Sequence, residues 1–223
     1  MEGGDGNDIF AIQSDGSASA KITAAGGKDA DTYYINNWTG TAAHVIEIKN
    51  GDSVLGSHDV VYGFKSTTNK LDLEQTVTKT TANTDDNKVY NGVDVGVVKA
   101  HHAAANGVVT FFKADTTTDG GAAGAEGKEG VATENATADA AGLSSKLDAG
   151  KYGDASNALM INKNNLADAV NYLSKYLEGT TKTVYFAYDK NGDGVLDQND
   201  SVMLFQKGGA QDTLVELAGV YSA

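Results

Sequence analysis

The clearest metal-binding spacing in the chain lies near its carboxyl end, between residues 189 and 200. Oxygen-bearing side chains recur there at nearly alternate positions, and Gly194 falls where the backbone of a calcium loop must turn sharply. The candidate ligand positions are Asp189, Asn191, Asp193, Val195, Asp197 and Asp200. They match a twelve-residue calcium loop, with Asp in the last position where Glu is usual. Because the side-chain donors are hard oxygens without His or Cys, the segment favours Ca2+ over zinc or copper.

The residues on both sides of this loop predict strands, whereas an EF-hand loop joins two helices. Residues 183–188 and 201–206 are rich in aromatic and β-branched side chains, a composition typical of strands. We therefore expect the loop to join two strands. The alternative is an acidic surface turn without metal, because Asp, Asn and Gly favour turns in any case.

A second candidate metal site lies at the amino end, in a glycine-rich motif that occurs twice. Residues 3–8 read Gly-Gly-Asp-Gly-Asn-Asp before an apolar strand start, which matches the nonapeptide of calcium-binding parallel β-rolls. A second copy, whose third Gly has become Asp, follows at residues 26–31. Its glycines allow carbonyls to turn toward an ion, and its Asp residues supply carboxylates. The candidate ligands are Gly3, Asp5, Asp8, Gly26, Lys28, Asp29 and Asp31.

Calcium in a roll is shared between stacked turns, so we hypothesise that Asp8 and Asp31 share one ion. The alternative is a pair of Gly-rich hairpin turns without metal.

The remaining sequence predicts more strands, one helix and one long insertion. We expect a mainly β fold, with a short parallel β-roll at residues 1–40 stacked on a β-sandwich-like capping domain at residues 41–223. An insertion at about 75–180 interrupts the second part, and residues 115–158 within it are rich in Gly, Ala, Thr and Asp, which indicates a long loop.

One amphipathic helix is predicted at about 164–178, near the end of this insertion. Asn164 can cap its start and Gly179 its end. We expect its apolar stripe to pack on the sheet as core and not as a ligand site. The stripe consists of Leu166, Ala169, Val170, Leu173, Tyr176 and Leu177.

The composition excludes several classes of function. The chain has 223 residues, a formal net charge of -13 and no Arg, which argues against nucleic acid and against an anionic membrane surface. No stretch approaches the apolar length of a membrane span, so we expect no membrane insertion. The absence of Cys excludes disulfides and thiolate catalysis. A divalent cation would relieve the repulsion among the excess carboxylates.

Two further segments carry a family resemblance. Residues 59–64 read Asp-Val-Val-Tyr-Gly-Phe and residues 69–73 read Asn-Lys-Leu-Asp-Leu. Together they resemble the capping segment after the last repeat of repeats-in-toxin (RTX) proteins, the type I secreted proteins that include serralysin-like C-terminal domains, large adhesins and S-layer proteins. Residues 212–220 resemble the final strand of such domains. The resemblance covers about residues 1–75 and 180–223, and it implies a secreted protein of the bacterial surface that folds on calcium outside the cell.

These observations favour a calcium-binding, non-enzymatic C-terminal domain of a type I secreted S-layer protein or adhesin. We expect the chain to be an excised piece of a longer protein, with self-assembly or a cell-surface glycan as its possible partner. It contains no His-Glu-x-x-His and no Gly-x-Ser-x-Gly, the motifs of the zinc proteases and lipases that share these repeats. Two alternatives remain. One is an accessory domain of a secreted hydrolase, and the other is a glycan- or lipopolysaccharide-binding module that uses the 115–158 loop.

Overall fold

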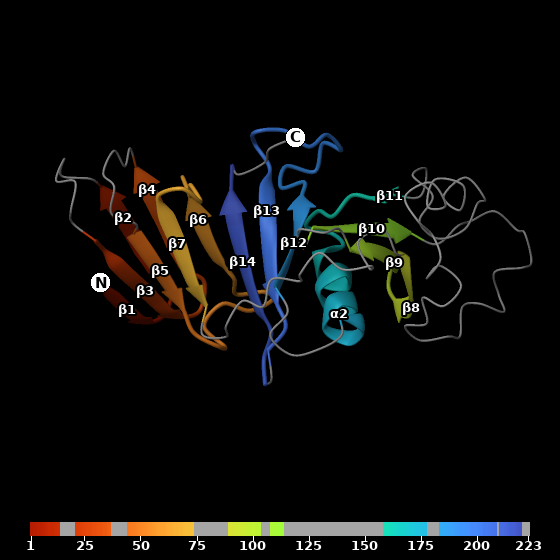
Figure 1. Cartoon of the computed structure of the whole chain (residues 1–223), viewed down its shortest axis with the longest axis horizontal. Helices are drawn as coiled ribbons and strands as arrows, with labels where there is room; N and C mark the ends of the chain where they lie inside the picture. Colours follow the sequence, from red (N-terminus) through yellow and green to blue (C-terminus); the bar gives the residue numbers. More distant parts are fainter. Residues whose placement is uncertain are drawn as a thin grey trace, which may run out of the picture. The chain divides into compact units, whose positions relative to one another are not determined.

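The computed structural model of the chain describes residues 1–13, 21–36, 44–73, 89–103, 108–113, 158–177, 183–208 and 210–219. The fold is mainly β, as the sequence predicts, with one α-helix in the described residues (Figure 1). The chain divides into two compact units. The first comprises Met1–Thr78, Gly179–Thr183 and Val195–Ala223, and the second comprises Lys79–Glu178 and Val184–Gly194.

The amino-terminal part of the first unit is a parallel solenoid with two sheets. Odd-numbered strands form one sheet in the order β1-β3-β5-β7, and β2, β4 and β6 are neighbours in the other. Every pairing among these strands is parallel. Because consecutive strands alternate between sheets, each coil adds one strand to each, which is the arrangement expected of a β-roll. The strands, red to yellow in Figure 1, are β1 (Glu2–Asp5), β2 (Ile9–Gln13), β3 (Thr23–Lys28), β4 (Thr32–Asn36), β5 (His44–Ile48), β6 (Asp59–Tyr62) and β7 (Asn69–Leu73).

Alternating apolar residues explain why these short segments form strands. In β2, Phe10 and Ile12 are buried, while the residues between and beside them are exposed. Tyr33 and Ile35 repeat this pattern in β4, and the Phe10 and Tyr33 rings stack with their centroids 5.1 Å apart. Each such side chain contributes about 1.5–3 kcal/mol by leaving water, so the alternation fixes which face points inward.

The solenoid extends beyond residue 40, the boundary predicted from the glycine-rich repeats. Strands β5 and β7 pair in parallel from His44 opposite Asn69 to Ile48 opposite Leu73. These later coils lack the nonapeptide motif but keep buried apolar residues facing the interior. The motif therefore marks only the coils with glycine-rich turns, whereas the apolar pattern marks the whole solenoid.

The last two strands of the chain extend one sheet of the solenoid. Strand β14 (Thr213–Ala218) pairs in parallel with β6 and antiparallel with β13 (Ser201–Gln206). Val215 and Leu217 join the same apolar core as the coils. The predicted sandwich-like stacking of this segment is thus replaced by edge-to-edge pairing, which satisfies the backbone groups along the free edge of β6.

The second unit contains an antiparallel sheet in the order β11-β10-β9-β8, together with the helix. Helix α2 (Leu166–Tyr176) packs against β8 and β9. The strands of this unit are β8 (Val89–Val95), β9 (Val98–Ala103), β10 (Val109–Lys113), β11 (Ala158–Leu159) and β12 (Thr183–Tyr188). The first residue of β12, Thr183, is assigned to the first unit. The predicted loop at 115–158 lies outside the described residues.

Helix α2 confirms the predicted amphipathic helix and its buried stripe. The buried members are Leu166, Ala169, Val170, Leu173 and Leu177, the last just past the helix end. Tyr172 is fully buried as well, although it falls outside the predicted stripe, because its ring meets the Phe111 ring edge to face at 6.3 Å. The side chain of Tyr176 and the predicted cap at Gly179 lie outside the described residues.

The predicted N-cap of the helix is wrong by one residue. The N-cap position is held by Asn165 and not by Asn164, and no side chain caps the helix. The Asn165 amide is engaged elsewhere, since its Oδ1 accepts from the backbone N–H of Asn162 and its Nδ2 donates to the carbonyl of Met160. No helix in the described part of the chain is long and apolar enough to cross a membrane.

Candidate metal centre

The two glycine-rich motifs form stacked turns at one end of the solenoid strands. Residues 3–8 span the end of β1 and the turn before β2, residues 26–31 span the end of β3 and the turn before β4, and Gly4 lies opposite Gly27 in the parallel register. The turns need left-handed backbone, with φ between 82° and 114° at Gly4, Gly6, Gly27 and Asp29. Asp29 stands where the motif normally has Gly, and its backbone is left-handed as well. Asp tolerates this conformation better than most residues.

Each turn folds an aspartate carboxylate back against its first glycine. A Cβ atom on Gly3 would collide with Oδ2 of Asp8, and one on Gly26 would collide with Oδ2 of Asp31. Only glycine allows a carboxylate to approach the backbone this closely. The result is a pair of equivalent cradles, one in each coil.

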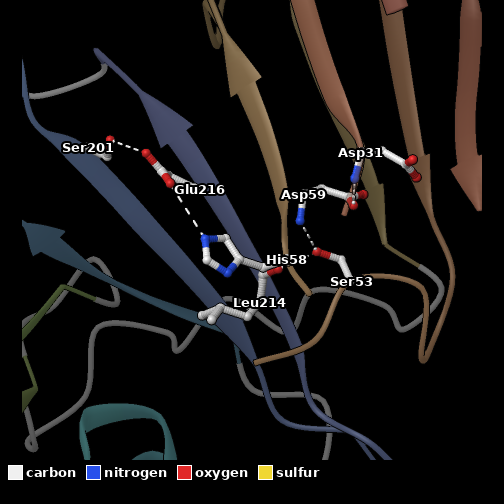
Figure 2. Close-up of polar contacts among 7 residues, drawn as sticks. All are labelled: Asp31, Ser53, His58, Asp59, Ser201, Leu214 and Glu216. Carbon is white, nitrogen blue, oxygen red and sulfur yellow. Dashed lines mark hydrogen bonds and ion pairs between the residues drawn. The ribbon is translucent and has the colours of Figure 1, made fainter. Parts of the chain in front are cut away.

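The carboxylates are connected from coil to coil through the backbone. The N–H of Asp8 donates to Oδ1 of Asp31 at 2.8 Å, and the N–H of Asp31 donates to Oδ1 of Asp59 at 3.0 Å. The N–H of Asp59 then donates to Oγ of Ser53 at 2.7 Å, and the Ser53 hydroxyl donates to the carbonyl of Leu214 (Figure 2). We call Asp8, Asp31 and Asp59 the aspartate ladder, which Ser53 terminates.

Because the aspartate ladder is buried, charging all of its carboxylates at once costs free energy. Asp31 is 0% and Asp59 is 1% exposed, and the Oδ2 atoms of Asp8 and Asp31 are buried without a hydrogen-bond partner. Burial raises the pKa of Asp31, and it raises the pKa of Asp59 to about 7 despite the hydrogen bond from Asp31 N–H. Repulsion from the Asp31 carboxylate raises the pKa of Asp59 further, and repulsion from the Asp8 carboxylate does the same to the pKa of Asp31. Such a row requires protons or a cation to balance it.

The structure brings together only some of the predicted roll ligands. Gly3, Asp8, Gly26 and Asp31 form the cradles. Asp5, Lys28 and Asp29 are exposed and do not take part in the cradles.

The exposed residues of the turns have other roles. Asp5 lies opposite Lys28 in the strand register, and Lys28 offers a cation only its backbone carbonyl. The carboxylate of Asp29 accepts a hydrogen bond from the N–H of Gly6 at 3.2 Å, so it ties the second turn to the first.

Sequence reasoning missed two members of this arrangement, Asp59 and Ser53. The signal for Asp59 was present, because an Asp lies two residues before the first buried apolar side chain of β2, β4 and β6 alike. Ser53 has no such signal, since its position depends on the turn that precedes β6.

The first half of the predicted acidic loop, in the second unit, is organised by Asp189. This residue is 1% exposed, and its N–H donates to the carbonyl of Ile161 at 2.8 Å. Its carboxylate accepts from the N–H groups of Gly192 at 2.6 Å and Gly194 at 3.0 Å. Beyond it, the amide of Asn191 donates to the carboxylate of Asp193 at 2.8 Å.

The second half of the loop belongs to the first unit, which the chain enters at Val195. The N–H of Asp197 donates to Oδ2 of Asp200 at 2.7 Å, and Asp200 is 0% exposed. The carbonyl of Asp200 accepts from the N–H of Gly219 at 2.9 Å. Strands β12 and β13 flank the loop, which confirms the predicted strand–loop–strand order.

A different polar cluster lies on β14. The buried carboxylate of Glu216 accepts the Ser201 hydroxyl at 2.6 Å and lies 3.5 Å from Nε2 of the partly buried His58 (Figure 2). In a nucleophilic triad the serine hydroxyl contacts the imidazole, and the carboxylate orients that imidazole. Here the hydroxyl contacts the carboxylate instead, so the cluster does not reproduce that arrangement.

No family model, curated protein or solved structure matches the chain. Within the described ranges, no three His, Cys, Asp or Glu side chains gather so that they alone could hold a metal ion. The cradles instead hold the carboxylates of Asp8 and Asp31 against glycines, and the backbone carbonyl of Gly26 also lies close to Gly3, so these donors are all hard oxygens. That set fits Ca2+, which commonly takes carboxylate, carbonyl and water oxygens together.

Proposed function

We propose that this chain is a calcium-binding, non-enzymatic domain whose parallel solenoid is stabilised by Ca2+ at its glycine-rich turns. The observation that carries this proposal is the pair of buried, unpartnered Oδ2 atoms on Asp8 and Asp31. Each lies against a glycine that leaves no space for a side chain. A buried carboxylate oxygen without a hydrogen-bond donor is costly, and a cation between the two coils would satisfy both atoms.

In this proposal the residues of the chain supply ligands and hold the coils at a fixed separation. Asp8 and Asp31 offer their Oδ2 atoms to the ion. The hydrogen bond from Asp8 N–H to Asp31 Oδ1 fixes the position of the Asp31 carboxylate relative to the coil that carries Asp8. Bound calcium supplies the positive charge that a chain with net charge -13 lacks at this position. Metal binding is thereby coupled to folding of the turns.

The biological setting proposed for the domain rests on the RTX resemblance. A type I secreted surface protein, such as an S-layer protein or adhesin, meets about millimolar calcium only after it leaves the cell. A chain whose coils repel one another without calcium would be less stable before export, and calcium would stabilise its fold afterwards. The acidic loop at 189–200 is proposed as a second calcium site on the strength of its ligand spacing.

A calcium titration of the whole chain tests the proposal. The metal-free protein is titrated with Ca2+, and with Mg2+ in parallel, while circular dichroism follows thermal unfolding. A free calcium concentration of about 100 times the Kd of one site stabilises the fold by about 2.7 kcal/mol. For a chain of this length, that gain raises the Tm by roughly 5–10 °C. Mg2+ should give a smaller shift because it demands a tighter octahedral shell.

The variant Asp31→Asn separates the cradle from general charge effects. It keeps an oxygen that can accept the Asp8 N–H but removes a ligand charge, so we expect it to lose most of the calcium-dependent rise in Tm. The matched control is Asp72→Asn, which makes the same change at an exposed position of β7. Equal calcium responses in Asp31→Asn and Asp72→Asn, or no response in the unmodified chain, would refute the cradle as a calcium site.

A further inference from the structure

The outward face of the even-numbered solenoid sheet carries a short row of aligned residues. In the parallel register, Ala11 of β2 lies opposite Tyr34 of β4, and Tyr34 lies opposite Tyr62 of β6. The alternate positions of the same strands, Phe10, Ile12, Tyr33, Ile35 and Val61, point into the core. The row therefore lies on the side of the sheet away from the apolar interior.

The two tyrosines form a stack, and within the described residues no second ring stacks on the other face of Tyr34. Their centroids are 4.9 Å apart with an interplanar angle of 11°, so one face of Tyr34 is covered by Tyr62. On the other side the aligned residue is Ala11, whose methyl group is too short to cover a ring. Tyr34 is accordingly 40% exposed, whereas Tyr62 is partly buried. Ala11 occupies the position where a third tyrosine would continue the stack.

The space above Ala11 is a shelf with an aromatic wall and uncharged edges. We define the shelf by Ile9, Ala11 and Gln13 of β2 and by Tyr34 and Asn36 of β4, all of which are exposed. Ile9 is 75% exposed. Gln13 and Asn36 each offer an amide donor and an acceptor at one end of the shelf. Strand β2 is the last strand of this sheet, so no described strand lies beyond Ala11.

This combination selects a class of ligand. The open face of an aromatic ring packs well against a flat ring that presents C–H groups, and side-chain amides pair with hydroxyl groups around its edge. A pyranose has both features. None of the five shelf residues is charged, and the net charge of -13 disfavours a polyanion. The chemistry therefore points to a neutral saccharide.

We propose that the shelf binds a neutral saccharide, with one pyranose ring stacked on the open face of Tyr34 above Ala11. The sugar ring takes the place of the missing third rung of the tyrosine stack. This inference goes beyond calcium binding, and it needs only a folded solenoid. It also differs from a glycan site in the 115–158 loop, because every residue of the shelf lies in β2 or β4.

The test uses the whole calcium-loaded chain and three neutral probes: maltohexaose, cellohexaose and mannohexaose. Isothermal titration calorimetry measures affinity, and saturation-transfer NMR identifies the sugar protons that contact the protein. We expect at least one probe to bind saturably. Tyr34→Ala should weaken that binding about tenfold by removing the stacking surface. Tyr34→Phe, which keeps the ring, should bind within about threefold of the unmodified chain.

Filling the shelf is the sharper test. Ala11→Tyr keeps every other residue of the shelf but places a third tyrosine ring where the sugar ring would stack. Because this ring would block the site, the variant should also reduce affinity about tenfold. Ala11→Ser is the matched control that leaves the shelf open, and it should bind as the unmodified chain does. Circular dichroism of each variant in calcium separates loss of the saccharide site from loss of calcium-dependent folding.

Three results would overturn the proposal. The first is the absence of saturable binding by all three probes to the folded chain. The second is equal binding to Ala11→Tyr and Ala11→Ser. The third is a dimer of the unmodified chain that Ala11→Tyr converts to monomer in sedimentation velocity, which would assign the shelf to a second copy of the chain.

Discussion

The stability of the calcium-free domain should fall as the pH rises, and Asp59 should account for most of that fall. Its carboxyl group is 1% exposed, and burial raises its pKa from 3.8 to about 7 in the folded chain. The folded state therefore holds a proton that the unfolded state releases. Stability from this group is fully present below pH 3.8 and is lost progressively until the pH passes about 7.

The size of the effect follows from the same two values. A difference of about three pKa units, at 1.36 kcal/mol for each unit, corresponds to a loss of about 4 kcal/mol across the interval. This loss is a large share of the roughly 5–15 kcal/mol that holds a typical domain folded. Asp31 contributes in the same direction, because burial raises its pKa too.

The substitution Asp59→Asn provides the direct measurement. An asparagine stays neutral at every pH, and its Oδ1 can still accept the hydrogen bond from Asp31 N–H. Urea unfolding in metal-depleted buffer at pH 5 and pH 8, followed by circular dichroism, should show a steep loss of stability for the unmodified chain and a much smaller loss for the variant. Asp72→Asn, at an exposed position, should retain the steep loss.

The reasoning is refuted if the unmodified chain and Asp59→Asn lose the same free energy of unfolding between these two pH values. Such a result would mean that the buried carboxylate does not hold a proton in the folded state. Addition of saturating calcium should flatten the profile of the unmodified chain, because the cation then balances the charge of the aspartate ladder.

Three further outcomes are expected. Asp29→Gly removes both the left-handed strain of a non-glycine residue and the hydrogen bond to Gly6, so the free energy of unfolding without calcium should change by less than about 1 kcal/mol, and the calcium-induced rise in Tm should persist. Asp193→Ala removes a predicted loop ligand and should reduce the loss of Tm on adding EDTA; an unchanged EDTA effect would exclude the acidic loop as the stabilising site. Leu173→Ala, at a fully buried helix position, should cost about 2–5 kcal/mol in chemical unfolding, whereas Asn171→Ala on the exposed face should cost less than about 0.5 kcal/mol.

Local patterns determined much of the solenoid and the helix. The strand at 69–73 and the helix near 166–176 follow directly from apolar residues at strand and helix spacing. The glycine-rich turns were equally readable, because their left-handed residues must be Gly or a residue that tolerates the same backbone. Patterns of this kind depend on residues that are neighbours along the chain, so the sequence is enough to predict these elements.

Tertiary structure alone decided where the solenoid ends and which carboxylates share a row. Asp8, Asp31 and Asp59 come together because three parallel strands pair in one register, and Ser53 closes the row because β14 brings a carbonyl of Leu214 to its hydroxyl. The open face of Tyr34 likewise depends on which residue β2 places opposite it. The physical reason is common to all three cases: residues far apart in sequence acquire their surroundings from strand pairing, and the free energy of burying a charge or a ring depends on those surroundings.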